Sequence, residues 1–370
     1  MQVLGIDLGT TNTVAAIANH VVPIAENGSG VLPSVVAFLP NGKTFVGSTA
    51  RRRRVIDAEN TIYSSKRIIG RSYSDPATED FRERYRFRLV KGAEGLPCFA
   101  TRAGEFSATD IAGLVLSEVL DRVRSIRGEF EVRLTVPPTF TTSQREATLE
   151  AAARAGIRRV ALLDEPTATA FAYLSLPLNA KRGLVYDLGG GTFDCAVVDW
   201  SEARPHVVAQ SSDLFLGGDD IDERLAGWVL EYVLEKYNWD LASYIEVYDR
   251  LVSRCEEIKI ALSEQEVAVL PLSQVDPECP AVSEGVTVTR SVLSEQCQEI
   301  MCRTFITCDD VLRAAGLRAA DIDAVFLAGG TTHLPVIRAG IETYFGQRGL
   351  LEFEPTEVVA RGASLALRSP

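Results

Sequence analysis

The sequence predicts an α/β protein with two lobes built on one plan, each carrying an inserted subdomain. The first observation is an internal echo: a strand, a turn headed by Asp-Leu-Gly and a returning strand occur at residues 3–17 and again at 183–198. Apolar residues at helical spacing follow each hairpin, which is the order typical of α/β architecture. The chain of 370 residues is also longer than a single hydrophobic core usually accommodates, so more than one domain or subdomain is expected.

The first lobe is expected over residues 1–181. Its opening hairpin leads into an arginine-rich, β-rich insertion over about 37–107, which we expect to form a smaller subdomain. Residues 108–127 then carry apolar side chains at helical spacing and predict a helix. A further helix is expected to open over residues 141–146, where Ser143 and Glu146 have the spacing of a capping box.

The second lobe is expected over residues 182–370, with its own insertion over about 220–293. Long helices are predicted over 220–262, with an inner face formed by Trp228, Leu230, Val233, Leu234 and Tyr237. A last helix is predicted over 357–367. No low-complexity linker separates the lobes, so we expect them to meet through packed helices.

Composition and charge argue against several classes of protein. With 38 basic and 50 acidic residues the formal net charge is −12, so nucleic acid is not expected as a partner. The arginine runs at 51–54 and 82–88 suit RNA or an acidic partner, but a solvated face is expected in so acidic a chain. No basic leader and no apolar run of about 18 residues is found, so we expect no membrane contact. Seven cysteines without a Cys-x-x-Cys pair indicate reduced thiols in the cytoplasm.

The two Asp-Leu-Gly turns have the chemistry of a phosphate site. Consecutive glycines let backbone N–H groups approach phosphate oxygens that a Cβ would block. Neighbouring hydroxyls and carboxylates complete the pattern, and because carboxylates repel bare phosphate, a hydrated Mg²⁺ is expected between them. These residues are Thr10, Thr11 and Thr192, and Asp7, Asp187 and Asp194. One such turn is more often an ordinary hairpin, but two copies favour a shared site.

The sequence contains two other glycine motifs. Residues 37–44 pass a relaxed Walker A pattern, but the Asn41-Gly42 pair between two β-rich runs predicts a β-hairpin instead. Residues 325–335 read as a buried strand ending at Gly329-Gly330, where a base or ribose can lie against the backbone beside His333. Taken alone, this last motif is equally well explained as a tight turn.

The three motifs, Asp-Leu-Gly-Thr-Thr, Asp-Leu-Gly-Gly-Gly-Thr and the Gly-Gly strand end, resemble the signatures of the seventy-kilodalton heat-shock chaperone (DnaK-type) nucleotide-binding domain. That family belongs to the actin-like ATPase superfamily, in which each lobe has a ribonuclease-H-like core. The resemblance extends between the motifs, to segments 64–71, 134–145, 164–168, 216–222 and 256–263. It therefore spans nearly the whole chain.

The resemblance implies a Mg²⁺-dependent ATPase that binds ATP or ADP between its lobes, with K⁺ nearby. It implies catalytic roles for Lys66, Glu165, Asp187, Thr192 and Asp194, and a metal held mainly through water by Asp7, Asp187 and Asp194. It implies nucleotide contacts from Gly9, Thr10, Thr11, Asn12, Gly189, Gly190, Gly191, Gly217, Gly218, Asp219, Glu256, Lys259, Ser263, Gly329, Gly330 and His333. Taken alone, Lys66 reads as a solvated charge and Glu165 as a charge at a helix N-terminus.

The sequence also departs from the family pattern. His333 stands where the family usually has an arginine that stacks on adenine, and Thr356 replaces its usual acidic residue, so weaker or altered base binding is expected. No peptide-binding domain is expected, since only three residues follow the predicted last helix. The resemblance implies an exchange factor or a J-domain-type co-chaperone as partner, and we expect a monomer. The alternatives are an actin-like polymerising ATPase and a metabolite kinase of the same superfamily.

Overall fold

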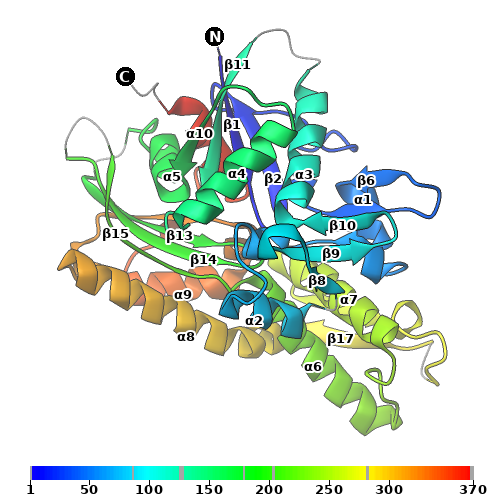
Figure 1. Cartoon of the computed structure of the whole chain (residues 1–370). Coiled ribbons are helices and arrows are strands. Elements are labelled where there is room, and N and C mark those ends of the chain that lie inside the picture. The colour runs from blue at the N-terminus through cyan, green and yellow to red at the C-terminus, as the bar shows by residue number, and fades with distance from the viewer. Residues whose placement is uncertain are drawn as a thin grey trace.

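The computed structural model describes residues 2–85, 87–124, 129–177, 180–201, 205–280 and 283–366. Over these residues it is a mixed α/β protein, with two large sheets and three small ones (Figure 1). The predicted α/β class is therefore confirmed. No helix in the described part of the chain is long and apolar enough to cross a membrane.

The first large sheet has the strand order β12-β11-β1-β2-β3, and β4 also pairs with β2. Its strands are β1 (Gln2–Leu8), β2 (Asn12–Ile17), β3 (His20–Val21), β4 (Val31–Pro33), β11 (Phe130–Val136) and β12 (Val160–Asp164). The second large sheet has the order β15-β14-β13-β18-β19. Its strands are β13 (Arg182–Leu188), β14 (Phe193–Asp199), β15 (His206–Asp213), β18 (Ala324–Ala328) and β19 (Gly349–Leu350).

The two large sheets repeat one strand plan. In each, the first strand forms an antiparallel hairpin with the next, β1 with β2 and β13 with β14. On its other side the first strand pairs in parallel with a strand from much later in the chain, β11 or β18. The repeated Asp-Leu-Gly turns thus correspond to a repeated strand topology. As a result, both turns leave the equivalent end of the equivalent strand.

Helices α3 (Ala108–Val123) and α4 (Thr142–Arg154) pack together and share a core with the first sheet. The expected capping box of α4 was wrong: the cap is Thr141, whose side chain and that of Gln144 exchange bonds with each other's backbone N–H groups. Helix α3 ends before the predicted residue 127, and residues 125–128 lie outside the described part.

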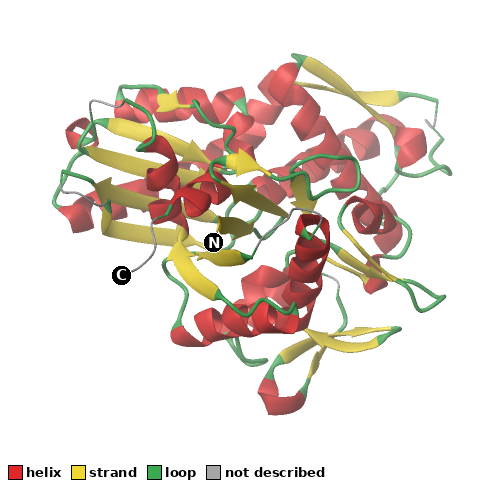
Figure 2. Ribbon diagram, turned by 90° about the horizontal axis from the view of Figure 1, so that it is seen from above, coloured by secondary structure: helices red, strands yellow, loops and turns green. Residues whose placement is uncertain are grey.

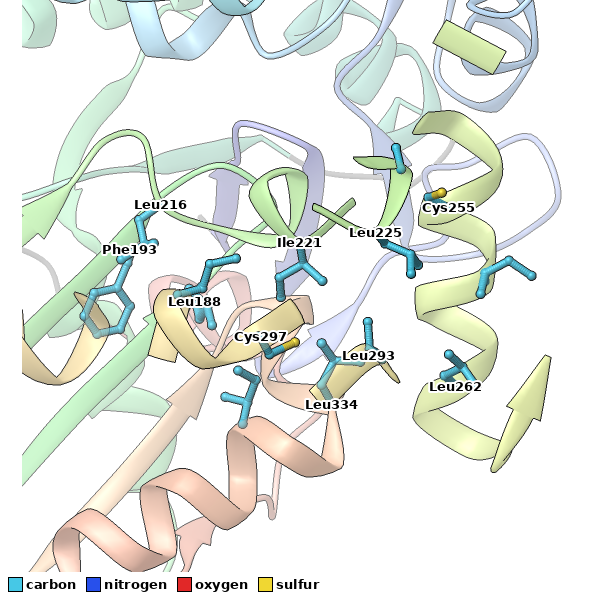
Figure 3. Packing of buried hydrophobic residues seen from close by; sticks show 14 of the residues in the cluster. Leu188, Phe193, Leu216, Ile221, Leu225, Cys255, Leu262, Leu293, Cys297 and Leu334 are labelled. Atoms are coloured by element: carbon cyan, nitrogen blue, oxygen red, sulfur yellow. The ribbon is translucent and has the colours of Figure 1, made fainter. Parts of the chain in front are cut away.

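The second sheet is covered on its outer side by α8 (Arg290–Ala315) and α9 (Pro335–Phe345) (Figure 1). Its core continues into α6 (Gly218–Tyr237) and α7 (Ile245–Glu264), the long helices predicted from the sequence. Figure 3 shows side chains from these helices and from the sheet in one cluster, with Leu188 and Phe193 at one side, Ile221 and Cys297 in the middle and Cys255 at the other side. On α6, Val233 is buried as expected, but Leu234 is 44% exposed and does not belong to the inner face.

Helices α5 (Glu165–Tyr173) and α10 (Val358–Leu365) lie between the two large sheets (Figure 1). They cross at very close range: a Cβ on Gly362 would lie 1.7 Å from the Ala168 carbonyl oxygen. Helix α10 also lies against β1, where a Cβ on Gly5 would meet the Ser364 nitrogen at 2.4 Å. Only glycine allows these backbones to approach so closely.

The remaining strands form small ribbons at the edges of the molecule (Figure 2), and the remaining helices are short. The small sheets are β6-β5-β7, β10-β9-β8 and β16-β17. Their strands are β5 (Val36–Phe38), β6 (Thr44–Val46), β7 (Thr61–Ile62), β8 (Leu89–Lys91), β9 (Pro97–Thr101), β10 (Gly104–Ser107), β16 (Val267–Pro271) and β17 (Gly285–Thr289), and the short helices include α1 (Ser48–Arg53), α2 (Pro76–Arg84), η2 (Ser65–Ile68) and η6 (Gly330–His333). The antiparallel β5–β6 pair turns at Gly42, whose φ is +77°, so residues 37–44 form a hairpin and not a P-loop.

All seven cysteines carry free thiols, as predicted. Cys302 on α8 is exposed and the other six are buried. The arginine run at 51–54 is not a free basic surface, since Arg51 pairs with Glu256 and Arg54 stacks on the ring of Tyr63.

Candidate functional site

The turns that follow β1 and β13 line one cavity, of about 80 Å³, between the two large sheets. The β18 strand end opens onto the same cavity. Most of the residues singled out from the sequence are brought together here. The lining consists of Asp7, Gly9, Thr10, Thr11, Asn12, Lys66, Glu165, Asp187, Gly189, Gly190, Thr192, Asp194, Gly329, Gly330, Pro355, Thr356 and Val359.

The second glycine turn is held from behind by its own half of the chain. The Gly189 N–H donates to the Thr192 carbonyl at 3.0 Å and closes the turn. The carbonyls of Gly189 and Gly190 accept from the N–H groups of Gly218 and Asp219, at 3.0 and 2.6 Å. With these carbonyls engaged behind it, the turn is fixed in place while its other side borders the cavity.

The segment before α6 sits so close to this turn that no side chain fits between them. A Cβ on Gly217 would lie 2.6 Å from the Gly190 carbonyl oxygen. A Cβ on Gly218 would lie 2.7 Å from Thr331 Oγ1 and 2.8 Å from Lys259 Nζ. Gly217, Gly218 and Asp219 therefore buttress the turn rather than line the cavity.

Thr11 reaches from the first turn towards the second. Its hydroxyl oxygen is buried and has no hydrogen-bond partner, and it lies 2.2 Å from where a Cβ on Gly190 would be. An unpaired buried hydroxyl costs free energy unless a ligand satisfies it. This orphan hydroxyl between two glycine turns fits a phosphate oxygen.

Four carboxylates and one ammonium group converge on the cavity. Lys66 Nζ, on η2, donates to Glu165 Oε1 at 2.8 Å, at the N-terminus of α5. Asp7 accepts from the Thr135 hydroxyl at 2.9 Å. Asp194 accepts from the Ser212 hydroxyl, and the fourth carboxylate is Asp187.

This crowding of negative charge shifts the pKa values of the aspartates. Burial raises the pKa of Asp7 to about 6 and that of Asp194 to about 7, and in both the charge of Glu165 adds to the rise. Burial, followed by the charge of Glu165, raises the pKa of Asp187 well above its ordinary value. Burial alone would lower the pKa of Lys66, but the charges of Glu165 and Asp7 outweigh it and raise it. The group is short of positive charge, which a bound cation would supply.

The arrangement favours a hydrated metal ion over a directly ligated one. Among the described residues, no three histidine, cysteine, aspartate or glutamate side chains are close enough to hold one ion between them. Mg²⁺ keeps several of its waters in proteins and binds through few carboxylates. The donor set present here therefore fits Mg²⁺ held through water.

The Gly-Gly end of β18 also reaches the cavity. Gly329 has a φ of +80°, and a Cβ there would lie 2.3 Å from the Leu188 carbonyl oxygen. His333, expected beside a base, contacts Glu354 through Nε2 and does not line the cavity. Thr356 does line it.

The α7 residues predicted to bind the nucleoside have protein partners in this structure. Lys259 Nζ donates to Asp222 Oδ2 at 2.7 Å and to the Gly218 carbonyl at 2.9 Å. Glu256 pairs with Arg51 at 2.7 Å, and burial, which would raise its pKa, is outweighed by Arg51 and Lys259, which lower it. Ser263 does not line the cavity either, and its carbonyl accepts from Arg290 at 3.2 Å.

Comparison with known protein families identifies the family of this chain. The model of the family described as Hsp70 protein matches residues 3–368, nearly the whole chain. The chain belongs to the Hsp70 family. The resemblance inferred from the motifs is thereby confirmed, and the chain is a chaperone-type, ATP-binding ATPase module.

Several residues that support the site of this Hsp70 chain were not assigned a role from the sequence, although Thr135, Asp222 and Thr331 lie inside segments that resemble the family. Ser212 and Thr135 reach the aspartates from neighbouring strands, and Thr331 donates to the Gly189 carbonyl at 2.8 Å. Asp222, the partner of Lys259, is likewise buried. Such contacts depend on which strands and helices become neighbours, and a motif identifies a segment without showing which of its side chains reaches which partner.

Proposed function

We propose that this Hsp70 chain hydrolyses ATP slowly and with Mg²⁺, and that two lobes, 1–181 and 182–370, close on the nucleotide. The insertions at about 37–107 and 220–293 are then subdomains crowning actin-like lobes with ribonuclease-H-like cores. The observation that carries the proposal is the single cavity lined by both Asp-Leu-Gly turns and by the Lys66–Glu165 pair. The repeated strand plan of the two large sheets supports two lobes of one design.

In this proposal the glycine turns hold the β- and γ-phosphates. Backbone N–H groups of the Gly189–Gly191 turn and the hydroxyls of Thr10, Thr11 and Thr192 are the donors. The orphan hydroxyl of Thr11 supports this role, because a phosphate oxygen would satisfy it. Donors fixed in advance are the main source of rate in phosphoryl transfer.

Asp7, Asp187 and Asp194 would hold Mg²⁺ mainly through its waters. When bound, the ion neutralises charge on the β- and γ-phosphate oxygens. Lys66 positions the attacking water and balances the charge of the γ-phosphate, and Glu165 holds Lys66 and accepts the water's proton. The 2.8 Å contact between these two side chains supports a shared task.

The base end of the site is proposed to be weaker than in other family members. His333 is paired with Glu354 and 37% of its side chain is exposed, so stacking on adenine requires it to leave that partner. Glu256, Lys259 and Ser263 would contact the ribose and base only if the cleft opens between α7 and the first half. A K⁺ ion near the phosphates and an exchange factor or J-domain-type partner stay predictions from the resemblance. A monomeric state and the cytoplasmic location expected from the cysteines also stay predictions.

The test is ATP turnover by the purified chain, measured with and without Mg²⁺. We expect a rate well below about 10 s⁻¹, the median for enzymes, that disappears when Mg²⁺ is chelated. Turnover that does not respond to Mg²⁺ would contradict the metal assignment. Filaments that pellet with Mg-ATP would favour a polymerising protein, and ADP release that depends on an added sugar would favour a kinase.

A further inference from the structure

Arg67 is the residue of η2 that crosses from the first half of the chain into the second. Its side chain is 0% exposed. Nη1 donates to the Leu214 carbonyl at 2.7 Å, and Nη2 lies 3.4 Å from Asp219 Oδ2. The guanidinium also lies against the phosphate turn, since a Cβ on Gly191 would be 2.4 Å from Nη2.

Stability does not explain this burial. The Asp219 contact is long for a charged pair, and Arg67 Nε is buried with no hydrogen-bond partner. Taking a guanidinium out of water costs free energy that only well-made bonds repay. The rings of Phe215 and Tyr85 lie 5.1 and 5.6 Å from its Cζ, which offsets part of that cost.

The contacts of Arg67 instead connect the two sides of the cavity. Asp219, which faces Arg67, donates its N–H to the Gly190 carbonyl at 2.6 Å. Its carboxylate also accepts from the Tyr85 hydroxyl at 3.2 Å, so a side chain of the first insertion holds it too. One short helix therefore carries two neighbouring cations: Lys66 faces the carboxylates of the cavity, and Arg67 lies behind the glycine turn.

We propose that Arg67 is a positioning residue for hydrolysis, which fixes the Gly189–Gly191 turn relative to Lys66. The inference rests on the proposed function, in which the turn holds the phosphates and Lys66 positions the water. Arg67 reaches its partners only when the two halves are together. It therefore sets the geometry of the reacting groups, while ATP affinity depends on the turns and the metal.

Arg84 provides a matched control, because it also joins the two halves by a charged pair. Its Nη1 lies 2.8 Å from Asp220 Oδ1, one residue beyond Asp219, but 30% of its side chain is exposed. The pair is only partly exposed, with Asp220 at 11%, so it controls for a charged contact between the halves that lies away from the turn. Arg84 touches neither the glycine turn nor the cavity lining.

The experiment measures single-turnover hydrolysis and the ATP dissociation constant of the full chain for Arg67→Ala, Arg67→Lys and Arg84→Ala. A displacement of about 1 Å in reacting groups can cost about a hundredfold in rate. We therefore expect Arg67→Ala to hydrolyse about tenfold to a hundredfold more slowly, with affinity changed less than about threefold. Guanidinium chloride at low, non-denaturing concentration should restore part of the rate, and ammonium chloride should not. Arg84→Ala should hydrolyse within about twofold of the wild-type rate, because Arg84 contacts neither the turn nor the cavity lining.

Several outcomes would overturn the inference. One is a wild-type rate in Arg67→Ala, and another is a loss of affinity equal to the loss of rate, which would make Arg67 an ordinary interface residue. If Arg67→Ala does not fold, Arg67→Lys decides, since it keeps the charge but not the paired donors, and a wild-type rate there refutes the proposal. A wild-type chain without ATP turnover refutes the proposed function itself, whereas an active wild type with an equally active Arg67→Ala refutes only this inference.

Discussion

Replacing Gly217 by alanine isolates the geometry of the phosphate turn from its chemistry. The backbone of Gly217 is extended, with φ at −178°, so alanine fits it without strain. The new Cβ would lie 2.6 Å from both the carbonyl carbon and oxygen of Gly190, and 2.7 Å from Gly191 N. Carbon atoms in contact stay about 3.5–4 Å apart, so the turn must retreat by about 1 Å. No rotamer change relieves this contact, because all three atoms belong to the backbone.

A shift of about 1 Å at the reacting groups corresponds to a rate loss of about a hundredfold. The assay is single-turnover hydrolysis with protein in excess over ATP, together with a calorimetric affinity and a thermal melt. Gly227→Ala is the control: it lies in the same helix, and a Cβ there would meet nothing within 4 Å. It should leave the rate unchanged and stabilise the helix by up to about 1 kcal/mol. If Gly217→Ala hydrolyses as fast as Gly227→Ala, the tight backing of the turn has no catalytic role.

Other perturbations follow from the same site. Lys66→Ala should abolish hydrolysis and leave ATP affinity nearly intact, and a collapse of binding would show that its role is not catalytic. Asp187→Asn should weaken ATP binding in a magnesium titration, and an unchanged magnesium dependence would remove it from the metal site. The stability of the chain should also depend on pH. The pKa of Asp194 is about 7 in the folded chain and 3.8 ordinarily, so between these pH values the folded chain binds more protons than the unfolded chain. The free energy of unfolding of the metal-free chain should therefore fall as pH rises from about 4 to 7. Melts across this range should show a smaller fall in Asp194→Asn, and equal slopes would contradict the assignment.

The phosphate side of the site was predictable because its residues lie close together in the sequence. Each Asp-Leu-Gly turn joins two strands of one hairpin, so strand pairing alone brings its aspartate, glycines and threonine together. The repetition of the turn then predicted two sheets of one plan. The Asn41-Gly42 hairpin was predictable for the same local reason.

Contacts made across long stretches of chain were not predictable in this way. The partner of Lys259 is Asp222, on another helix, and several acidic residues of the insertion were equally eligible. Helix starts also admit rival patterns: Thr141 with Gln144 and Ser143 with Glu146 both have cap spacing, and the end of the preceding loop decides between them. Leu234 follows the buried Val233 by a turn of about 100° on the helix, enough to carry it into solvent.

The contact between Gly362 and Ala168 limits how the two sheets could move in the proposed closure. Where two helices touch backbone to backbone, neither can slide towards the other, so rocking about the point of contact is the remaining freedom. The contact would then be the pivot of this rocking, and the small ribbons at the edges of the molecule lie away from it. A few degrees of rocking at Gly362 would displace these ribbons far more than the floor of the cavity. A methyl group on Gly362 would push helices α5 and α10 apart, so we expect Gly362→Ala to change how the two halves of the site meet, although Gly362 does not line the cavity.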